Sequence, residues 1–360
     1  MKIYKDVFGK IVSPENLFNA WANFKHDKRK RFDVQEFEIS LEENIFKLHR
    51  ELKAGIYKHG PYKPFYIYDP KQRLIHKATV RDRVVHHAIY SILNPIFEPT
   101  FIANSFSCRI GKGTHKGVEA LEKILRKVSR NNTRDCFALK CDIKKFFDSI
   151  DHRILLTTLA KRIKDGRTMS LLTEIVGSFA SHAARERERE REYFGSGLPI
   201  GNLTSQLFAN IYLSEFDHFV KHELKVKNYV RYTDDFVIVS GNRAYLEHLI
   251  EPISEFLKDN LKLSLHPQKV SLGKYRQGVD FLGYVIFPYH IAVRTKTKRR
   301  IFRKVRRYLA DYKSGILSEE TLRQSIASYL GVLSHANSFK LLGHLKEMFS
   351  GESGSFDKIR

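Results

Sequence analysis

Two adjacent carboxylates, Asp234 and Asp235, are the residues whose type and placement most strongly indicate chemistry. They separate two runs rich in aromatic and β-branched residues, 229–232 and 236–239, which are typical of two buried strands joined by a tight turn. Two like charges at the edge of a core are costly unless cations compensate them. The simpler interpretation is a hairpin turn whose Asp side chains point into water, since Asp is common in turns.

A third carboxylate, Asp142, lies in a strand predicted to begin at Phe137. Alternation places it on one face with Lys140, while Leu139, Cys141 and Ile143 lie on the other. Asp is disfavoured inside strands, so its presence needs a reason. If one antiparallel sheet brings the three carboxylates together, two divalent cations about 4 Å apart would relieve their repulsion and form a nucleotidyl-transfer centre. Mg²⁺ suits such carboxylate and phosphate oxygens.

The composition indicates a partner for such a centre. The 360 residues carry 63 Lys and Arg against 40 Asp and Glu, a net charge of +23, which implies a polyanion, nucleic acid before a membrane surface. The three cysteines are odd in number and lack metal-site spacing, so we expect reduced thiols in a cytoplasmic protein. No apolar run is long enough to span a membrane, and the N-terminus lacks an apolar signal core.

The N-terminal 60 residues are expected to be helical, with a capping box at Ser40–Glu43. A short hairpin should follow, made of 65–70 and 73–80 and broken at Asp69–Pro70. The apolar stripe from Val84 to Leu93 predicts a helix opened by Arg81 and Arg83. Cations oppose the dipole there, so these arginines should have an anionic partner, either Asp82 or a ligand phosphate.

The second half of the chain predicts further helices and strands. After the strand at Phe137, a helix should begin with Asp148 or Asp151 as its cap. Later elements are expected at these ranges: a turn-rich loop at 197–206, a helix from Leu207 to about Leu224 capped by Asn202 or Thr204, a helix over 245–261, and short strands at 263–269 and 279–286. We find no internal repeat.

The C-terminal segment predicts a separate small helical lobe with one basic face. Residues 291–310 hold nine Lys or Arg and no acid, around a stripe of Ile301, Val305 and Leu309. A one-sided basic helix of this kind tracks phosphates. The residues expected to bind nucleic acid are Arg299, Arg300, Arg303, Lys304 and Arg307.

Three other charged segments leave their roles open. The Gly-rich loop 105–115 is not a phosphate-binding P-loop and is equally consistent with a backbone-hugging loop or a plain helix lead-in. The alternating Arg–Glu tract at 185–192 is interpreted as a solvated protrusion. The run 25–31 has five basic residues and fits a solvated face or a phosphate contact.

Five ordered motifs resemble the palm of bacterial reverse transcriptases. Residues 139–152 resemble motif A and Tyr232–Asp235 motif C; Gly197–Asn202 resembles motif B, Leu261–Lys269 motif D, and Phe281–Tyr284 the primer grip. The resemblance runs from about residue 30 to about residue 345. It implies an α+β, right-hand polymerase fold: fingers with part of the palm at 1–135, a palm with an antiparallel sheet and packed helices at 136–290, and a basic helical thumb at 291–360.

Within that family, the chain most resembles the reverse transcriptases of diversity-generating retroelements. Ile200–Gln206 resembles their I-G-x-x-x-S-Q loop, whereas group II intron enzymes usually have Pro-Gln-Gly, with Gln where this chain has Ile200. Residues 109–115 and 329–337 are also similar to that subgroup. The resemblance implies an RNA-directed DNA polymerase that copies a template RNA into error-prone cDNA, and Ile200 is our candidate contributor to the errors opposite adenine.

The resemblance also implies roles for individual residues. Asp142, Asp234 and Asp235 would be catalytic and, with the Ile143 carbonyl, hold two Mg²⁺ ions, or Mn²⁺. Phe147 would reject a 2′-hydroxyl, and Lys269 would protonate pyrophosphate. The other residues expected to bind the incoming nucleotide are Arg73, Lys77, Arg81, Ile200, Gly201 and Gln206.

The expected partners are template RNA, an RNA or DNA primer, dNTPs and a small, basic, oligomeric accessory protein, with no membrane. The Arg–Glu tract and the run 25–31 are weak candidates for the accessory-protein surface. Two alternatives stay open: a stand-alone, defence-associated or group II intron-derived bacterial reverse transcriptase, and an RNA-binding maturase.

Overall fold

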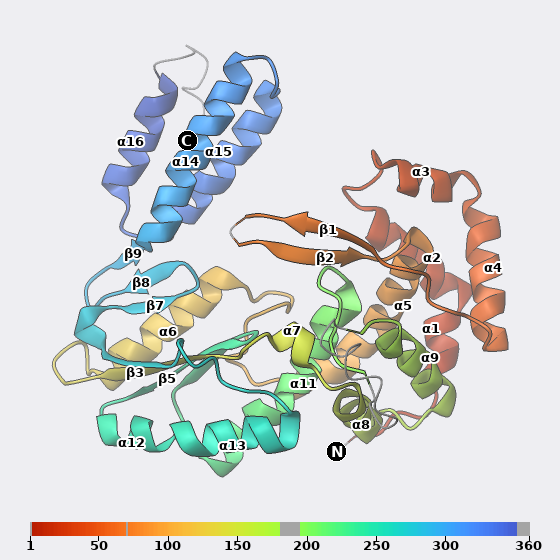
Figure 1. The fold of residues 1–360 in the computed structure, drawn as a ribbon, viewed down its shortest axis with the longest axis horizontal. Coiled ribbons are helices and arrows are strands. Elements are labelled where there is room, and N and C mark those ends of the chain that lie inside the picture. The colour runs from red at the N-terminus through yellow and green to blue at the C-terminus, as the bar shows by residue number, and fades with distance from the viewer. Residues whose placement is uncertain (1, 70, 181–194, 351–360) are drawn as a thin grey trace.

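The computed structural model describes residues 2–69, 71–180 and 195–350. Figure 1 shows a central sheet with helices on both sides, a group of N-terminal helices at one end, and three C-terminal helices above the other end. A two-stranded hairpin reaches out from the N-terminal group toward the C-terminal helices. The Arg–Glu tract at 185–192 and Pro70 lie outside the described residues.

The N-terminal group is helical, as expected. Its helices are α1 (Phe8–Val12), α2 (Pro14–Lys25), α3 (Phe32–Ile39), α4 (Leu41–Ala54) and α5 (Val80–Phe97). Apolar residues of α1, α2, α4 and α5, such as Trp21 and Ile89, are fully buried together. The predicted capping box at Ser40 is wrong. Ser40 precedes α4, but its side chain makes no cap hydrogen bond because its backbone (φ −115°, ψ 46°) departs from the usual extended cap geometry.

The predicted hairpin is present as β1 (Lys63–Ile67) and β2 (Arg73–Lys77), with Phe65 opposite Ile75. Its second strand ends at Lys77, short of the predicted Val80. Thr79 caps α5 by accepting a hydrogen bond from the amide of Asp82. The strand therefore ends before Thr79, because Val80 is already the first residue of the helix.

The central sheet is antiparallel, in the order β4–β5–β3–β6. Its strands are β3 (Phe137–Asp142), β4 (Tyr229–Tyr232), β5 (Asp235–Ser240) and β6 (Ser271–Lys274). Alternation sends Leu139 and Phe236 into the core shared with the N-terminal helices. Ala138 and Val237 enter a second core shared with α6 (Thr114–Val128). Both faces of the sheet are therefore buried, and only its ends are available for chemistry.

Helices complete the region around this sheet. They are α7 (Phe146–Ser149), α8 (His152–Arg162), α9 (Gly166–Gly177), α11 (Leu203–His218), α12 (Arg243–His248) and α13 (Ile250–Leu261); single helical turns lie at Glu98–Thr100, Phe219–Glu223 and Tyr275–Gln277. Of the two residues proposed to cap the helix after β3, Asp151 is the one that caps α8, by accepting from the amide of Ile154.

Three predicted boundaries in this region are wrong. The helix expected from Leu207 begins at Leu203, after Gly201 at φ +114° ends the loop, and Asn202 makes no side-chain cap. The helix expected over 245–261 is two helices, because Pro252 lacks an amide proton and fits the first turn of a new helix. The strand expected at 263–269 is replaced by a turn closed from Lys269 to His266 across Pro267, and pairing resumes in β6.

The C-terminal part starts with a small sheet of β7 (Val279–Phe281), β8 (Tyr284–Ile286) and β9 (Ile291–Val293). Helices α14 (Thr295–Lys313), α15 (Glu319–Ser334) and α16 (Phe339–Ser350) follow. The predicted apolar stripe of α14 is buried, and Ser318 caps α15. These helices share the second core with α6 and the central sheet.

A buried polar network ties α5 to the start of α11. His86 is 1% exposed, and its Nδ1 lies 2.7 Å from the Thr204 hydroxyl. Burial, followed by repulsion from the neighbouring His59, lowers the pKa of His86 to about 3. The imidazole is therefore neutral in the folded protein at neutral pH.

This network predicts a pH-dependent loss of stability. In the unfolded chain His86 takes up a proton below about pH 6.5, whereas in the folded chain it does so only near pH 3. Its contribution to the free energy of unfolding should therefore fall by about 2 kcal/mol between pH 7 and pH 5. Denaturant unfolding at the two pH values should show a smaller fall for His86→Gln than for the wild type; equal falls would contradict the assignment.

Candidate active site

Three Asp residues lie at one end of the central sheet. Asp142 is the last residue of β3 and pairs directly with Asp235, the first residue of β5. Asp234 lies in the turn before Asp235, and its carbonyl accepts a hydrogen bond of 3.1 Å from the amide of Ile143. Directly opposed residues of an antiparallel pair have Cα atoms about 5 Å apart. The sheet thus brings together the Asp residues that sequence reasoning grouped.

The electrostatics of this cluster reflect burial and crowding. The pKa of Asp235 is raised to about 6, mainly by burial and in part by the charges of Asp142 and Asp234, while Lys140 opposes the rise. Burial, followed by the charge of Asp142, also raises the pKa of Asp234, while Lys269 and Arg73 oppose that rise. The neighbouring charges thus make Asp234 and Asp235 harder to ionise, so the site favours added positive charge.

Two lysines supply part of that charge. Lys269 contacts both carboxylate oxygens of Asp142, at 2.9 and 3.0 Å. The segment before it is anchored by the amide of His266, which donates to the carbonyl of Asp142. Lys140 lies 3.6 Å from Asp235 and 3.6 Å from Asp280. Lys269 was predicted as a site residue, and Lys140 was noted only for sharing a face with Asp142.

A fully buried ion pair supports the turn from behind. Arg231 and Asp217 are both 0% exposed and are joined by two hydrogen bonds of 2.7 and 2.6 Å. The third guanidinium nitrogen, Nη1, donates to the carbonyl of Thr233 at 3.1 Å. Thr233 has the left-handed value φ +53°, which is unfavourable for a β-branched residue, and its hydroxyl donates to Ser107. Arg231 therefore stabilises the left-handed backbone of Thr233, which positions the neighbouring Asp234.

Sequence reasoning missed this pair. The available signal was one charged residue inside each of two apolar segments: Arg231 between Val230 and Tyr232, and Asp217 beside Phe216. Charged residues are almost never fully buried unless they are paired, so each one implied a partner.

Of the predicted triphosphate-binding cations, only Arg73 is associated with the carboxylates. Arg73 is exposed at the start of β2, and its charge acts on Asp234. Lys77 instead forms an ion pair of 2.7 Å with Asp33, and Arg81 pairs with Glu51 and Asp82. Arg83 also pairs with Asp33. The anionic partners expected for the arginines of α5 are thus carboxylates of this chain.

The motif B loop lies against the β1–β2 hairpin. The amide of His76 donates to the carbonyl of Ile200 at 3.2 Å, and the Asn202 amide group donates to the carbonyl of His76 at 3.1 Å. A Cβ atom on Gly201 would lie 2.8 Å from the Ile75 side chain, at a backbone φ of +114°. Glycine is therefore required at position 201, and Ile200 is held half-buried at this junction.

The same loop also reaches the segment after motif A. The amide of Leu198 donates to the carbonyl of Phe147 at 2.7 Å, which ties the predicted 2′-hydroxyl gate to the loop. Gln206 is exposed on the first turns of α11.

The predicted nucleic-acid-binding residues of α14 fall on two faces. Arg300 and Lys304 turn toward the β1–β2 hairpin and pair with Asp69 at 3.6 and 2.5 Å. Arg299, Arg303 and Arg307 are exposed, and Arg307 lies 3.5 Å from Asp311 on its own helix. The first face therefore contacts the turn of the hairpin.

The donor set at the carboxylates fits a hard divalent cation. Oδ1 of Asp235 is buried and accepts no hydrogen bond from the described residues, so an electron-rich oxygen is left for a cation. Across residues 2–69, 71–180 and 195–350, no three His, Cys, Asp or Glu side chains already converge on one point. Lys269 and Lys140 instead hold Asp142 and Asp235 individually. The Ile143 carbonyl stays a predicted ligand.

The buried pair yields a stability prediction. Arg231→Met leaves the buried carboxylate of Asp217 without its cationic partner, so the free energy of unfolding should fall by about 3–5 kcal/mol. The double variant Asp217→Asn/Arg231→Met should regain much of this stability. Its template-directed nucleotide addition should stay low, because the Thr233 carbonyl still lacks its donor.

Denaturant unfolding and nucleotide addition measure the two effects. The matched control is the more exposed pair Lys161–Glu215, where Lys161→Met should cost less than about 1 kcal/mol. Full activity in the double variant would contradict a positioning role for Arg231.

Comparison with known proteins agrees with this geometry. The family model described as reverse transcriptase (RNA-dependent DNA polymerase) matches residues 56–286. Protein YkfC of Escherichia coli K12 is 28% identical over 272 residues, which is 66% of this chain and 69% of YkfC. The group II intron-encoded protein LtrA of Lactococcus lactis is 26% identical over 353 residues, covering 79% of this chain but 57% of LtrA.

The described residues contain no helix long and apolar enough to cross a membrane.

Among solved structures, telomerase from Candida albicans has a TM-score of 0.47 and 12% identity, covering 76% of this chain and 55% of that one. The family match spans the hairpin, the carboxylates and the motif B loop, well over half of the chain. The chain therefore belongs to the reverse transcriptase family, has the right-hand polymerase fold and is an RNA-directed DNA polymerase.

Proposed function

We propose that this reverse transcriptase copies a template RNA into error-prone cDNA for a diversity-generating retroelement. The observation that carries the proposal is Ile200, which stands where group II intron enzymes usually have Gln and is fixed against β2 by the His76 amide. A β-branched apolar side chain there offers the nucleotide no hydrogen bond. Loss of a polar contact weakens discrimination between bases, since selectivity of this kind depends on paired polar groups.

A second candidate is a group II intron-derived reverse transcriptase or RNA-binding maturase. The similarity to LtrA, a group II intron-encoded protein, favours it. A neighbouring pair of template and variable repeats, together with a small accessory-protein gene, would favour the first candidate. We also propose the domain boundaries: the fingers end at residue 135, the palm covers 136–290 and the thumb begins at residue 291.

The three carboxylates are proposed to hold two Mg²⁺ ions, with Mn²⁺ as a substitute. The metal ions would supply activation of the primer 3′-hydroxyl and neutralisation of the triphosphate. Asp142, Asp234 and Asp235 would provide the oxygens, and the orphaned Oδ1 of Asp235 is the most available of them. Before a metal binds, Lys269 and Lys140 would partly neutralise the negative charge of Asp142 and Asp235.

Other residues of the chain act on the substrate. Arg73, which is exposed and whose charge acts on Asp234, would hold the triphosphate. Lys269, in contact with Asp142, would give a proton to leaving pyrophosphate. Phe147, whose carbonyl is hydrogen-bonded to the motif B loop, would exclude a ribose 2′-hydroxyl. Arg300 and Lys304 would exchange Asp69 for phosphates of the template and primer.

Asp234→Asn tests the proposed metal chemistry. It removes one charge from the cluster with little change in shape, so dNTP incorporation should fall below detection while RNA binding stays within about twofold of wild type. Primer extension and filter binding measure the two properties. The exposed substitution Asp259→Asn is the control and should leave both unchanged. Extension at a normal rate by Asp234→Asn would contradict the proposal.

Ile200→Gln tests the link to diversification. Wild-type products on an adenine-containing RNA template should carry errors mainly opposite adenine, and Ile200→Gln should reduce them several-fold relative to errors at other bases. The matched control Ile200→Val keeps an apolar β-branched side chain and should keep the wild-type spectrum. Sequencing of primer-extension products, with and without an accessory protein, gives the measurement. An unchanged spectrum in Ile200→Gln would remove the basis of the proposal.

A further inference from the structure

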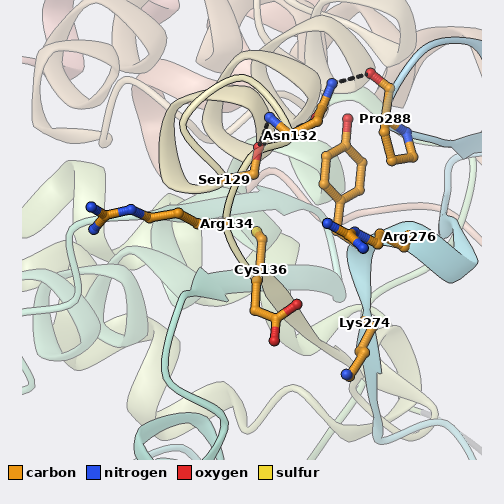
Figure 2. Close-up of a pocket in the computed structure, with 9 residues that line it drawn as sticks. Ser129, Asn132, Arg134, Cys136, Lys274, Arg276 and Pro288 are labelled. Atoms are coloured by element: carbon orange, nitrogen blue, oxygen red, sulfur yellow. Dashed lines mark hydrogen bonds between the residues drawn. The ribbon is translucent and has the colours of Figure 1, made fainter.

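A basic and aromatic recess lies at the end of the central sheet opposite the carboxylates. A cavity of about 460 Å³ is lined by Asn132, Arg276, Phe287, Pro288, Tyr289 and His290, within the range of small-ligand sites. A smaller recess of about 10 Å³ beside it shares Asn132, Arg276 and Pro288 and adds Arg134 and Lys274. Figure 2 shows the smaller recess, where Asn132 and Arg134 from the segment before β3 lie near Lys274 of β6, Arg276 of the following turn and Pro288 of the β8–β9 turn.

The recess is rigidly built. Arg130, Asn131 and Asn132 form a run of three left-handed residues, with φ of 47°, 55° and 71°. Such strain persists only where surrounding contacts impose it. The amide of Asn132 donates to the Ser129 hydroxyl at 3.0 Å, and its side chain donates to the carbonyl of Pro288 at 2.7 Å (Figure 2).

The aromatic side is equally constrained. The rings of Phe287 and His290 stack at 4.8 Å and 15°, and the Tyr275 hydroxyl donates to the carbonyl of Phe287. A Cβ atom at Gly278 would lie 2.6 Å from the Phe287 ring, so a glycine is needed for that ring to pack. Tyr289, on the same tight turn, is 81% exposed. A large ring is therefore presented to solvent on a fixed support.

The charge around the recess is mostly positive, and Asp135 is the one acidic residue in the two linings. Arg130, Arg134, Lys274 and Arg276 are all exposed. Among the residues that the structure describes, none of these four is within ion-pair distance of a carboxylate. Cations fixed on one face around an exposed ring attract an anionic ligand that also has a flat face.

The recess is separate from the catalytic end. Lys274 pairs with Phe137 at the start of β3, whereas Asp142 ends that strand. Six residues of strand span roughly 17 Å. The recess and the carboxylates therefore lie at opposite ends of β3.

We propose that this recess binds an unpaired nucleotide of an RNA segment lying outside the catalytic cleft. A base would stack on Tyr289, while Arg276, Arg130 and Arg134 take the flanking phosphates. Aromatic side chains flanked by cations are the usual means of binding single-stranded nucleic acid. The carboxylates of an acidic peptide would contact the cations but would not stack on the exposed ring. The inference rests on the proposal that the protein works on a template RNA, and it adds a second contact that retains the RNA during copying.

Binding to enzyme whose cleft is already filled tests the proposal. The full chain is saturated with an unlabelled RNA–DNA duplex ending in a dideoxy primer, plus the next dNTP, and a fluorescent eight-nucleotide oligo(U) RNA is then titrated by anisotropy. The wild type should bind the RNA, and Tyr289→Ala/Arg276→Ala should weaken binding at least tenfold. The matched control Arg243→Ala/Tyr245→Ala, on α12, should stay within twofold.

Primer extension on a short duplex is measured in parallel and should be unchanged in both double variants. A failure of the proposed function would appear in extension or its error spectrum, whereas a failure of this inference appears only in oligo(U) binding. The inference is overturned if oligo(U) does not bind the duplex-saturated wild type or binds both double variants equally. It is also overturned if polyglutamate of equal charge displaces the RNA as well as unlabelled oligo(U) does.

Discussion

Repulsion among three carboxylates at one end of a buried sheet is the constraint on which this structure depends. Asp142 of β3 and Asp235 of β5 lie opposite each other in paired strands, and Asp234 lies in the tight turn just before Asp235. Burial and mutual repulsion raise the pKa values of Asp234 and Asp235. A fold that only maximised its stability would not gather these charges, so the surrounding elements must hold them in place.

Several elements of the fold position these carboxylates. The Lys269 turn approaches Asp142 from the segment after α13, and Lys140 approaches Asp235 from within β3. Behind the turn, Arg231 joins Asp217 of α11 to the carbonyl of Thr233. The helix that begins at the motif B loop thus also anchors the catalytic turn. Because the loop is hydrogen-bonded to β2, the hairpin, the motif B loop and the carboxylates belong to one connected structure.

The sequence was sufficient for the elements whose pattern is local. The strand at Phe137, the 229–240 hairpin, the stripe of α14 and the grouping of the three Asp residues all follow from periodicity and from the oddity of Asp in a strand. Boundaries failed where a single residue changed the backbone, as at Pro252, Pro267 and Gly201. The ion pairs of Lys77 with Asp33, Arg81 with Glu51 and Arg231 with Asp217 join distant segments. No local pattern specifies such partners, so two predicted substrate cations turned out to be paired within the chain.

The central claim is that these carboxylates add deoxynucleotides to a primer under the direction of an RNA template. The most direct measurement is extension of a DNA primer on an RNA template by the purified wild-type chain as Mg²⁺ is titrated, with dNTPs and NTPs supplied separately. The account predicts template-directed extension that rises with Mg²⁺, requires dNTPs and stops on addition of EDTA. Tight binding of the primer–template without extension at any Mg²⁺ or Mn²⁺ concentration would contradict it.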